Sequence, residues 1–360
     1  MEHYNPILGS EPNGQKFITC GEIMLRLTPP NYEKIRMASS FEASYGGSEA
    51  NIALALANLG VDSTFFSVVP NNSLGKSAVR WLRSNDVHCT PMILTEPDET
   101  PSNRLGTYYL ETGYGIRPSK VIYDRAGSAI AEAKPGDIDW DKAFDGVDWF
   151  HITGITPAIS ESAMELSLES VKEAKKCGIT VSCDLNYRKN LWKYGKQASE
   201  VMRELAKYVD VAIANEEDVQ KSLEITVDVN VESGELDREK YRALGNKVLE
   251  AYPNMQCIAI TLRESHSADW NGWAACLNDG KDFYVSNKYE IRDIIDRVGG
   301  GDSFASGLIY GLMTYQDAQK AVNYGAVHGA LAMTTPGDTS MASLKEVEAK
   351  VNGGTARVQR

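Results

Sequence analysis

The sequence contains no long apolar run, no excess of basic residues and no close pair of cysteines. No apolar stretch approaches the ~20 residues that a membrane helix requires, which argues against a membrane-spanning protein. The net charge is −12 over 360 residues, so the chain has no long-range attraction for nucleic acid or for anionic lipid. We therefore expect a small-molecule ligand, and neither nucleic acid nor a membrane as a partner.

The six cysteines are scattered, and neither a Cys-x-x-Cys pair nor a histidine at a ligand interval accompanies them. This pattern is more typical of a reduced compartment than of a disulfide framework or a zinc site. The first 15 residues lack the basic start and the apolar core of a signal peptide. We expect residues 1–15 to form a flexible tail and the protein to be cytoplasmic.

Apolar runs with the length of strands alternate with helical patterns from about residue 146 onward. Examples are a strand at 149–153, a helix at 160–177 and a strand at 179–185. The alternation predicts an α/β domain with a parallel sheet and helices on both of its faces. Ligands of such a sheet bind at the carboxyl ends of its strands. Strand-like runs at 105–111 and 119–124 interrupt the alternation, and we expect them to form a small appendage.

The common phosphate-binding motifs are absent. The segment Gly75-Lys76-Ser77 resembles the end of a Walker A loop, but Pro70 stands where the first glycine belongs. Gly113 and Gly115 are followed by Pro118, where a dinucleotide fingerprint needs its third glycine. A nucleotide, if the protein uses one, must therefore be held in another way.

A run of three glycines near the C-terminus offers that alternative. Gly299, Gly300 and Gly301 precede Asp302 and an apolar helical pattern. Free backbone amides at a helix N-terminus, together with the positive end of the helix dipole, form an anion site without any lysine. Asp302 is then either a helix cap or a general base that takes a proton from a hydroxyl group during phosphoryl transfer.

A serine hydrolase is a further interpretation of the same segment. Gly301-Asp302-Ser303-Phe304-Ala305 has the outline of a nucleophile elbow. Such an enzyme needs an acid and then a histidine after the serine, and His328 is the histidine that follows. Its place on the next predicted helix makes this interpretation the weaker one.

The segment Asp296–Asp302 resembles the second signature of the ribokinase-like carbohydrate kinase family, which reads Asp-x-x-Gly-Ala-Gly-Asp. Gly300 replaces the usual Ala, and Arg297 replaces the usual Thr or Ser. The resemblance implies that Asp302 is the catalytic base and that Gly299–Asp302 forms the anion hole.

A second resemblance lies about 250 residues earlier, where Gly46 and Gly47 precede a helix that carries Asn51. By itself this is also the pattern of a turn followed by a helix cap. It resembles the family's first signature, in which glycines let the backbone approach a sugar and the Asn amide bonds its hydroxyls. The resemblance covers about residues 16–350. It implies a ribokinase-like three-layer sandwich with a small β-sheet lid near 22–45 and 100–130, ATP and Mg²⁺ as cofactors, and a homo-oligomer formed through the lid.

Asn215-Glu216-Glu217-Asp218 resembles the family's Asn-x-x-Glu motif, which is linked to magnesium and phosphate. Asp218 stands where Glu is usual, and a shorter carboxylate can act on Mg²⁺ through water. The resemblance implies that Asn215 binds the metal or phosphate and that Asp218 contributes indirectly. A plain acidic residue in the first turn of a helix is the alternative interpretation of Asp218.

Three further segments resemble the branch of the family that phosphorylates 2-keto-3-deoxygluconate: Gly106–Leu110, Tyr123–Ala129 and Asp184–Arg188. The substrate of that branch is an acid. An arginine guanidinium can bind its carboxylate through two hydrogen bonds, and a tyrosine ring can pack against the sugar. The resemblance implies that the sugar contacts include Tyr108, Tyr123, Arg125, Arg188 and Asp338. It also implies that Asn186 and Arg188 reach the ATP phosphates.

The adenine site is less defined, since Glu264, Ser265 and His266 follow a predicted strand where relatives carry a glycine-rich loop. We expect the nucleotide contacts there to include Thr261, Arg263 and Asn323. The sequence thus predicts an ATP-dependent kinase for the 6-hydroxyl of 2-keto-3-deoxygluconate. The alternatives are a kinase for a neutral ketose such as fructose and a non-catalytic sugar-binding regulator.

Overall fold

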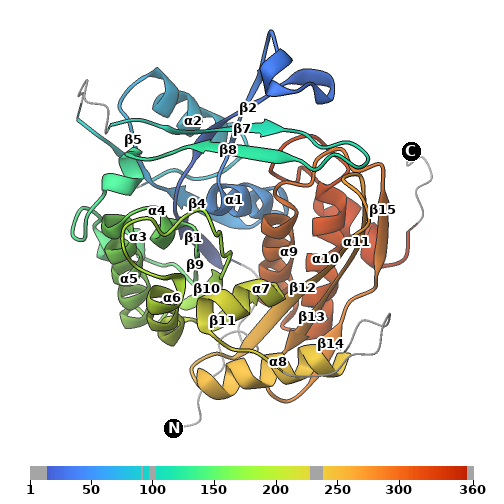
Figure 1. The fold of residues 1–360 in the computed structure, drawn as a ribbon. Coiled ribbons are helices and arrows are strands. Elements are labelled where there is room, and N and C mark those ends of the chain that lie inside the picture. Colours follow the sequence, from blue (N-terminus) through green and yellow to red (C-terminus); the bar gives the residue numbers. More distant parts are fainter. Residues whose placement is uncertain (1–13, 91, 97–102, 228–237, 355–360) are drawn as a thin grey trace.

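The computed structural model describes residues 14–90, 92–96, 103–227 and 238–354 (Figure 1). The predicted flexible tail lies outside these residues, apart from residues 14 and 15. Within them, no helix combines the length and the apolar character that crossing a membrane would demand. All six cysteines are free, and Cys257 and Cys276 are buried.

Nine strands form the main sheet, in the order β14-β13-β12-β11-β10-β9-β1-β4, with β15 beside β13. Neighbours from β4 to β12 run parallel, and the pairs that β13 makes with β12, β14 and β15 are antiparallel. The sheet is therefore mostly parallel, as predicted. Its strands are β1 (Lys16–Cys20), β4 (Asp62–Phe66), β9 (Trp149–Thr153), β10 (Thr180–Asp184), β11 (Val211–Ala214), β12 (Cys257–Ser265), β13 (Trp270–Asn278), β14 (Phe283–Val285) and β15 (Tyr289–Arg292).

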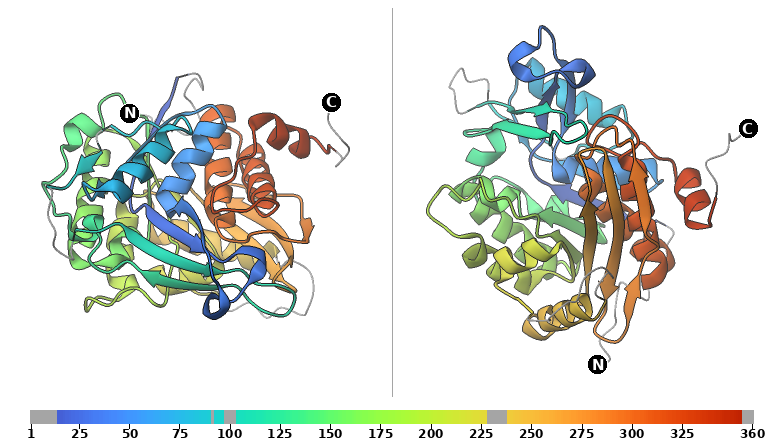
Figure 2. Two further views of the ribbon diagram at one scale, coloured as in Figure 1. Left: turned by 90° about the horizontal axis from the view of Figure 1, so that it is seen from above. Right: turned by 45° about the vertical axis from the view of Figure 1, so that its right-hand side comes forward.

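Helices cover both faces of this sheet (Figure 2), and each face has its own hydrophobic core. Alternate residues along a strand therefore belong to different cores. In β1, for instance, Phe17 packs into one core and Ile18 into the other. The first core includes residues of α1 (Ser48–Asn58), α2 (Ser73–Arg83), α9 (Gly300–Tyr315), α10 (Ala318–Ala332) and α11 (Leu344–Val351). The second includes residues of α3 (Trp140–Ala143), α5 (Glu161–Lys176), α6 (Ala198–Leu205) and α8 (Arg238–Ala251). Two short helices, α4 (Thr156–Ile159) and α7 (Glu216–Asp218), follow β9 and β11.

A separate sheet of four strands lies across the top of the molecule in Figure 1, in the order β3-β2-β7-β8. Its strands are β2 (Met24–Thr28), β3 (Glu42–Gly46), β7 (Gly106–Glu111) and β8 (Lys120–Asp124). They fall largely within the two segments for which a small sheet was predicted. The register aligns Arg26, Tyr108 and Tyr123 in one row across β2, β7 and β8. A further pair, β5 (Val68–Val69) and β6 (Ile93–Leu94), lies apart from both sheets.

Candidate active site

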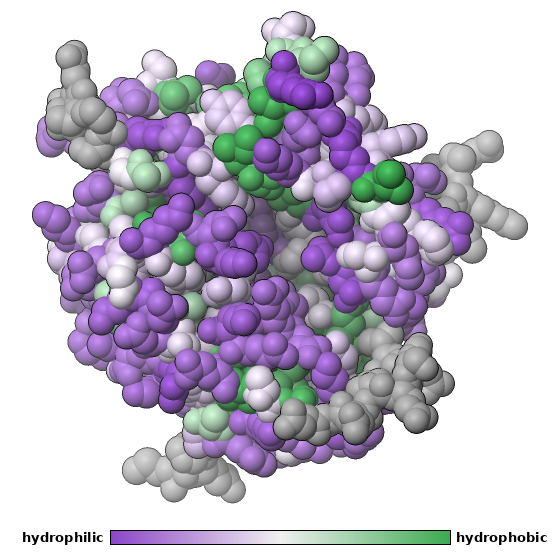
Figure 3. All heavy atoms as spheres, viewed as in Figure 1, coloured by the Kyte–Doolittle hydropathy of each residue, from purple (hydrophilic) through white to green (hydrophobic). Residues whose placement is uncertain are grey.

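A cleft of about 650 Å³ lies between the second sheet and the carboxyl ends of the parallel strands. In Figure 3 this face of the molecule is hollowed near its centre, beneath the second sheet. The walls come from the second sheet, the N-termini of α1 and α9, the segments that follow β10 and β11, and the C-terminal half of β12. A sheet of this topology places its ligand sites at this edge, as the sequence predicted.

Asp302 lies in the first turn of α9 and faces the N-terminus of α1. Ser48 Oγ donates a hydrogen bond to Asp302 Oδ1 at 2.6 Å, and Asn51 Nδ2 donates one to Oδ2 at 2.7 Å. Gly299 is the N-cap residue of α9, and the bonds that Asp302 accepts in the described residues come from α1 and not from amides of its own helix. Desolvation in the cleft raises the pKa of Asp302, while the bonds from Ser48 and Asn51 act in the opposite direction. The cap interpretation is therefore wrong, and the arrangement suits a carboxylate that accepts a proton.

Two of the predicted glycines are required by close approach of the backbone. Gly299 has φ +79°, and a Cβ there would lie 1.6 Å from Asp338 O. A Cβ on Gly47 would lie 1.9 Å from Glu22 O. Gly299 and Gly301 line the cleft, whereas Gly300 faces Met333, whose Cε would lie 3.0 Å from an added Cβ.

Asp338 is buried in a network that fastens the second sheet to the main domain. Arg26 forms ion pairs with both Asp338 and Asp296, and the Tyr108 hydroxyl donates to Asp338. Burial raises the pKa of Asp338 to about 6, against the opposing effects of Arg26 and Tyr108. Gly46 packs directly against this network and leaves no room for a side chain, since a Cβ there would lie 2.5 Å from Asp338 Oδ2. Asp296 is the first residue of the second signature, whereas sequence patterns gave no signal for Arg26 as part of the site.

Arg125 lines the cleft, as predicted, but it is paired with a carboxylate that the sequence did not indicate. Its Nε donates to Glu22 Oε2 at 2.7 Å, and its Nη2 donates to the same oxygen. Both side chains are buried, and the guanidinium lies 5.3 Å from the centre of the Tyr123 ring. Within the described part of the chain, Arg125 Nη1 and Glu22 Oε1 have no hydrogen-bond partner. The Nη1 group of Arg125 is thus available to bind a ligand.

The ends of β10 and β11 bring buried carboxylates into the cleft. Asp184 and Asp218 are both buried and both line the cleft. Burial, followed by the nearby charges of Asp218 and Asp302, raises the pKa of Asp184 well above its usual range. Asp218 accepts from the backbone amides of Asn215 and Tyr187, each at 2.9 Å, and so fixes the start of α7. Its structural role is established by these bonds, and its metal role stays a prediction.

The remaining predicted residues divide between the cleft and its surroundings. Asn186 lines the cleft and donates to Ser48 Oγ at 3.2 Å, which connects it to Asp302 through the serine. Asn323 on α10 is not among the cleft-lining residues and accepts a bond from Gln319 Nε2 at 3.2 Å. Its adenine contact therefore stays a prediction without structural support. The cleft-lining members of the predicted set also include Arg188, Asn215, Thr261 and Arg263.

The serine hydrolase interpretation is wrong. His328 Nδ1 lies 3.0 Å from Ser306 Oγ. The hydroxyl of Ser303 is buried without a partner in the described residues, so it lacks the base that a nucleophilic serine requires. Burial lowers the pKa of His328 to about 4, which keeps it neutral in the core.

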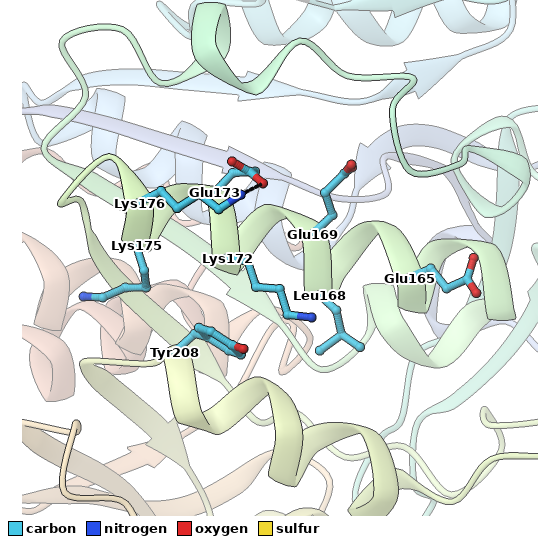
Figure 4. A pocket seen from close by; sticks show the side chains of 8 residues that line it. All are labelled: Glu165, Leu168, Glu169, Lys172, Glu173, Lys175, Lys176 and Tyr208. Carbon is cyan, nitrogen blue, oxygen red and sulfur yellow. Dashed lines mark hydrogen bonds and ion pairs between the residues drawn. The ribbon is translucent and has the colours of Figure 1, made fainter.

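A second depression lies on the outer surface of α5 and contains none of the predicted residues (Figure 4). Lysines and glutamates of α5 surround it, with Tyr208 below. Lys175 pairs with Asp210 at 2.7 Å and Lys176 with Glu173 at 2.6 Å, so these charges are already compensated. This depression therefore adds no group to the predicted site.

Glu49, beneath the cleft, gives a prediction about pH and stability. Its Oε1 accepts from Thr153 Oγ1 at 2.7 Å and from Thr156 Oγ1 at 2.8 Å, yet burial raises its pKa from 4.5 to about 7. The folded state therefore binds a proton below pH 7 that the unfolded chain binds only near pH 4.5. The wild type should lose stability as pH rises through this window, by about 1.4 kcal/mol per pH unit.

Glu49→Gln imitates the protonated form and removes this dependence. We expect the variant to unfold at higher denaturant concentration than the wild type at pH 8, and the difference to shrink toward pH 5. Denaturant titrations at the two pH values measure it. An equal difference at both values would show that Glu49 does not titrate in this range.

Comparison with known proteins adds three findings. The model of the pfkB family of carbohydrate kinases matches residues 15–345. A 2-dehydro-3-deoxygalactonokinase of Haloferax volcanii is 32% identical over 345 residues, which cover 96% of this chain and 99% of that protein. The crystal structure of 2-dehydro-3-deoxygluconokinase from Thermotoga maritima is 44% identical, with a TM-score of 0.87 over 94% of this chain and 100% of that one.

A putative ribokinase from E. coli, solved in complex with ATP and Mg²⁺, is 18% identical, with a TM-score of 0.74 over 94% of this chain and 99% of that one. At this identity the likeness concerns the fold alone. Together with the Thermotoga structure, it confirms the predicted ribokinase-like architecture.

Proposed function

Because this chain belongs to the pfkB family of carbohydrate kinases, we propose that it transfers the γ-phosphoryl group of ATP to the 6-hydroxyl of 2-keto-3-deoxygluconate. This sugar acid is the 2-dehydro-3-deoxygluconate in the name of the Thermotoga relative. The observation that carries the proposal is Asp302 at the N-terminus of α9, held by Ser48 and Asn51 and open to the cleft.

In the proposed reaction Asp302 accepts the proton of the 6-hydroxyl as its oxygen attacks the γ-phosphorus. The bond between that phosphorus and the bridging oxygen of ATP breaks, and ADP leaves with the electron pair. Backbone amides at the Gly299–Gly301 turn stabilise the charge on the transferring group. The pKa of Asp302 is raised toward neutral pH, and a general base works best when its pKa lies near the operating pH.

The site also offers suitable groups for the nucleotide and its metal. Asp184, Asp218 and Asn215 would supply the oxygen ligands that Mg²⁺ prefers, directly or through water. When bound, Mg²⁺ neutralises charge on the phosphates of ATP. Burial is the main cause of the raised pKa of Asp184, and the charge of Asp218 adds to it; a divalent cation beside the two carboxylates would remove this repulsion.

A row of side chains from the second sheet supports an acidic substrate. Tyr108 and Tyr123 are neighbours with ring centres 5.9 Å apart, and Arg125 lies beside Tyr123. Arg125 would bind the carboxylate of the sugar through Nη1, while Glu22 holds the rest of the fork in place. Both named relatives act on sugar acids that carry such a carboxylate.

We also propose that the second sheet acts as a lid. The tip of its β7–β8 hairpin bonds to the β12–β13 turn, through Ala268 N to Gly115 O at 2.9 Å and Gly115 N to Asp269 Oδ2 at 3.3 Å. A lid in this position would exclude water and so limit hydrolysis of ATP. Pairing of two chains through this sheet stays a prediction.

A screen of sugars in a coupled assay of ATP consumption tests the proposed function. We expect 2-keto-3-deoxygluconate or its galactonate epimer to give a kcat/KM at least about 10-fold above those of fructose and ribose, since the charged contact is lost with a neutral sugar. A neutral ketose as the best substrate would overturn the acid assignment. Sugar binding without ATP consumption would favour a regulator.

A further inference from the structure

Four arginines line the cleft, and three of them form no ion pair with an acid in the described stretches of the chain. Arg125 is paired with Glu22. Arg188, Arg263 and Arg297 line the same cleft, and none forms a salt bridge with a residue that the structure describes. Eight carboxylates line the cleft as well, so what sets these three arginines apart is that none of them is ion-paired within the described part of the chain.

Arg297 lies two residues before Gly299, at the entrance to the turn that precedes α9. Its Nη2 donates to Ser265 Oγ at 3.3 Å and to Asn271 Oδ1 at 3.5 Å. Both partners are neutral and both bonds are long, so they steady the side chain against the β12–β13 hairpin without compensating its charge. The resemblance to the family motif assigns no role to an arginine at this position.

Arg263 approaches the same space from the end of β12. It lies two residues after Thr261, on the same face of the strand, and forms no hydrogen bond within the described residues. Burial, then the charges of Arg297 and Arg188, lower the pKa of Arg263. The charge of Asp218 opposes this effect, so the repulsion that Arg297 and Arg188 exert on Arg263 is partly offset, and an anion bound between the three guanidinium groups would relieve the rest.

We propose that Arg297, together with Arg263 and Arg188, binds the polyphosphate chain of the nucleotide. Three converging guanidinium groups match several phosphate charges better than the single carboxylate of a sugar acid. They also adjoin the free amides at Gly299 and Gly301, whereas Tyr108, Tyr123 and Arg125 line the wall that the second sheet supplies. Arg297 is thus a binding residue for phosphate, and this inference rests on the proposed kinase function.

Calorimetric titration of ATP, ADP and AMP into the full-length protein, with Mg²⁺ and without sugar, tests the assignment. Arg297→Ala should weaken ATP binding by about 10-fold or more, ADP binding by less, and AMP binding by no more than about 2-fold. Arg297→Lys should retain part of the affinity, because the charge stays but the planar fork is lost. The KM for the sugar should change little.

The matched control is Arg292→Ala on β15, whose guanidinium lies over the Trp270 ring, 4.5 Å from its centre, and not in the cleft. This variant should bind all three nucleotides as the wild type does. Equal weakening of ATP and AMP by Arg297→Ala, or no weakening of either, would overturn the phosphate assignment. A change in the KM for the sugar alone would also overturn it. If the wild type binds none of the nucleotides, the kinase assignment itself fails.

Discussion

Asp302→Asn should lower kcat by about 10²–10⁴-fold, which is the usual contribution of a general base. The substitution keeps the shape of the side chain, and the Ser48 hydroxyl can reverse its hydrogen bond to accept from the new amide. The start of α9 should therefore stay in place. Steady-state kinetics should show the loss almost wholly in kcat, with the KM for the sugar within a few-fold of the wild type.

Asp317→Asn is the matched control for this experiment. Asp317 caps α10 by accepting from Lys320 N at 2.9 Å, and Asn caps a helix equally well. This variant should retain wild-type turnover. If Asp302→Asn also retains it, Asp302 is not the base. A large loss that coincides with a lowered melting temperature would point to a structural effect instead.

The paired substitution Glu22→Gln with Arg125→Gln should reduce kcat/KM for the keto acid by about 10- to 100-fold, the effect of losing a charged hydrogen bond. Activity on a neutral sugar such as fructose should change far less. Arg125→Gln alone is a poor test, because it leaves the buried Glu22 carboxylate without its partner. Breaking a buried ion pair in this way costs about 3–5 kcal/mol of stability.

Glu22→Gln alone supplies the comparison for the paired variant. This variant breaks the same buried ion pair and should lose comparable stability, but it leaves the Arg125 charge available to the substrate. The preference for the acid should therefore be kept or increased. The discriminating quantity is the ratio of kcat/KM for the keto acid to that for fructose in the three proteins. An unchanged ratio in the paired variant would show that Arg125 does not bind the carboxylate of the substrate.

The sequence was sufficient for the architecture because its signals are local and periodic. The apolar run of β9 and the helical pattern of α5 were predicted within a residue of their observed bounds. The elements β15 and α11 were not recognised, since each buries a single residue and so carries little apolar periodicity. The two glycine signatures were recognised because each lies in a continuous segment.

Sequence patterns did not predict contacts between single residues that lie far apart in the chain. Arg26 is 270 residues from Asp296 and 312 from Asp338, and a lone arginine on a strand carries no sign of either partner. Ser48 was likewise overlooked as a partner of Asp302, and Glu22 as a partner of Arg125. Each of these pairs depends on how the second sheet or α1 packs against the rest of the chain, which spacing alone does not encode.

Phosphorus NMR of the product tests the central claim most directly. Wild-type protein, Mg²⁺, ATP and 2-keto-3-deoxygluconate should yield ADP and an equal amount of one new phosphomonoester. Its signal should be split into a triplet by two protons, because the 6-hydroxyl is borne by a CH₂ group. A doublet would place the phosphate on a secondary hydroxyl, and release of inorganic phosphate without an ester would contradict the assignment of a sugar kinase.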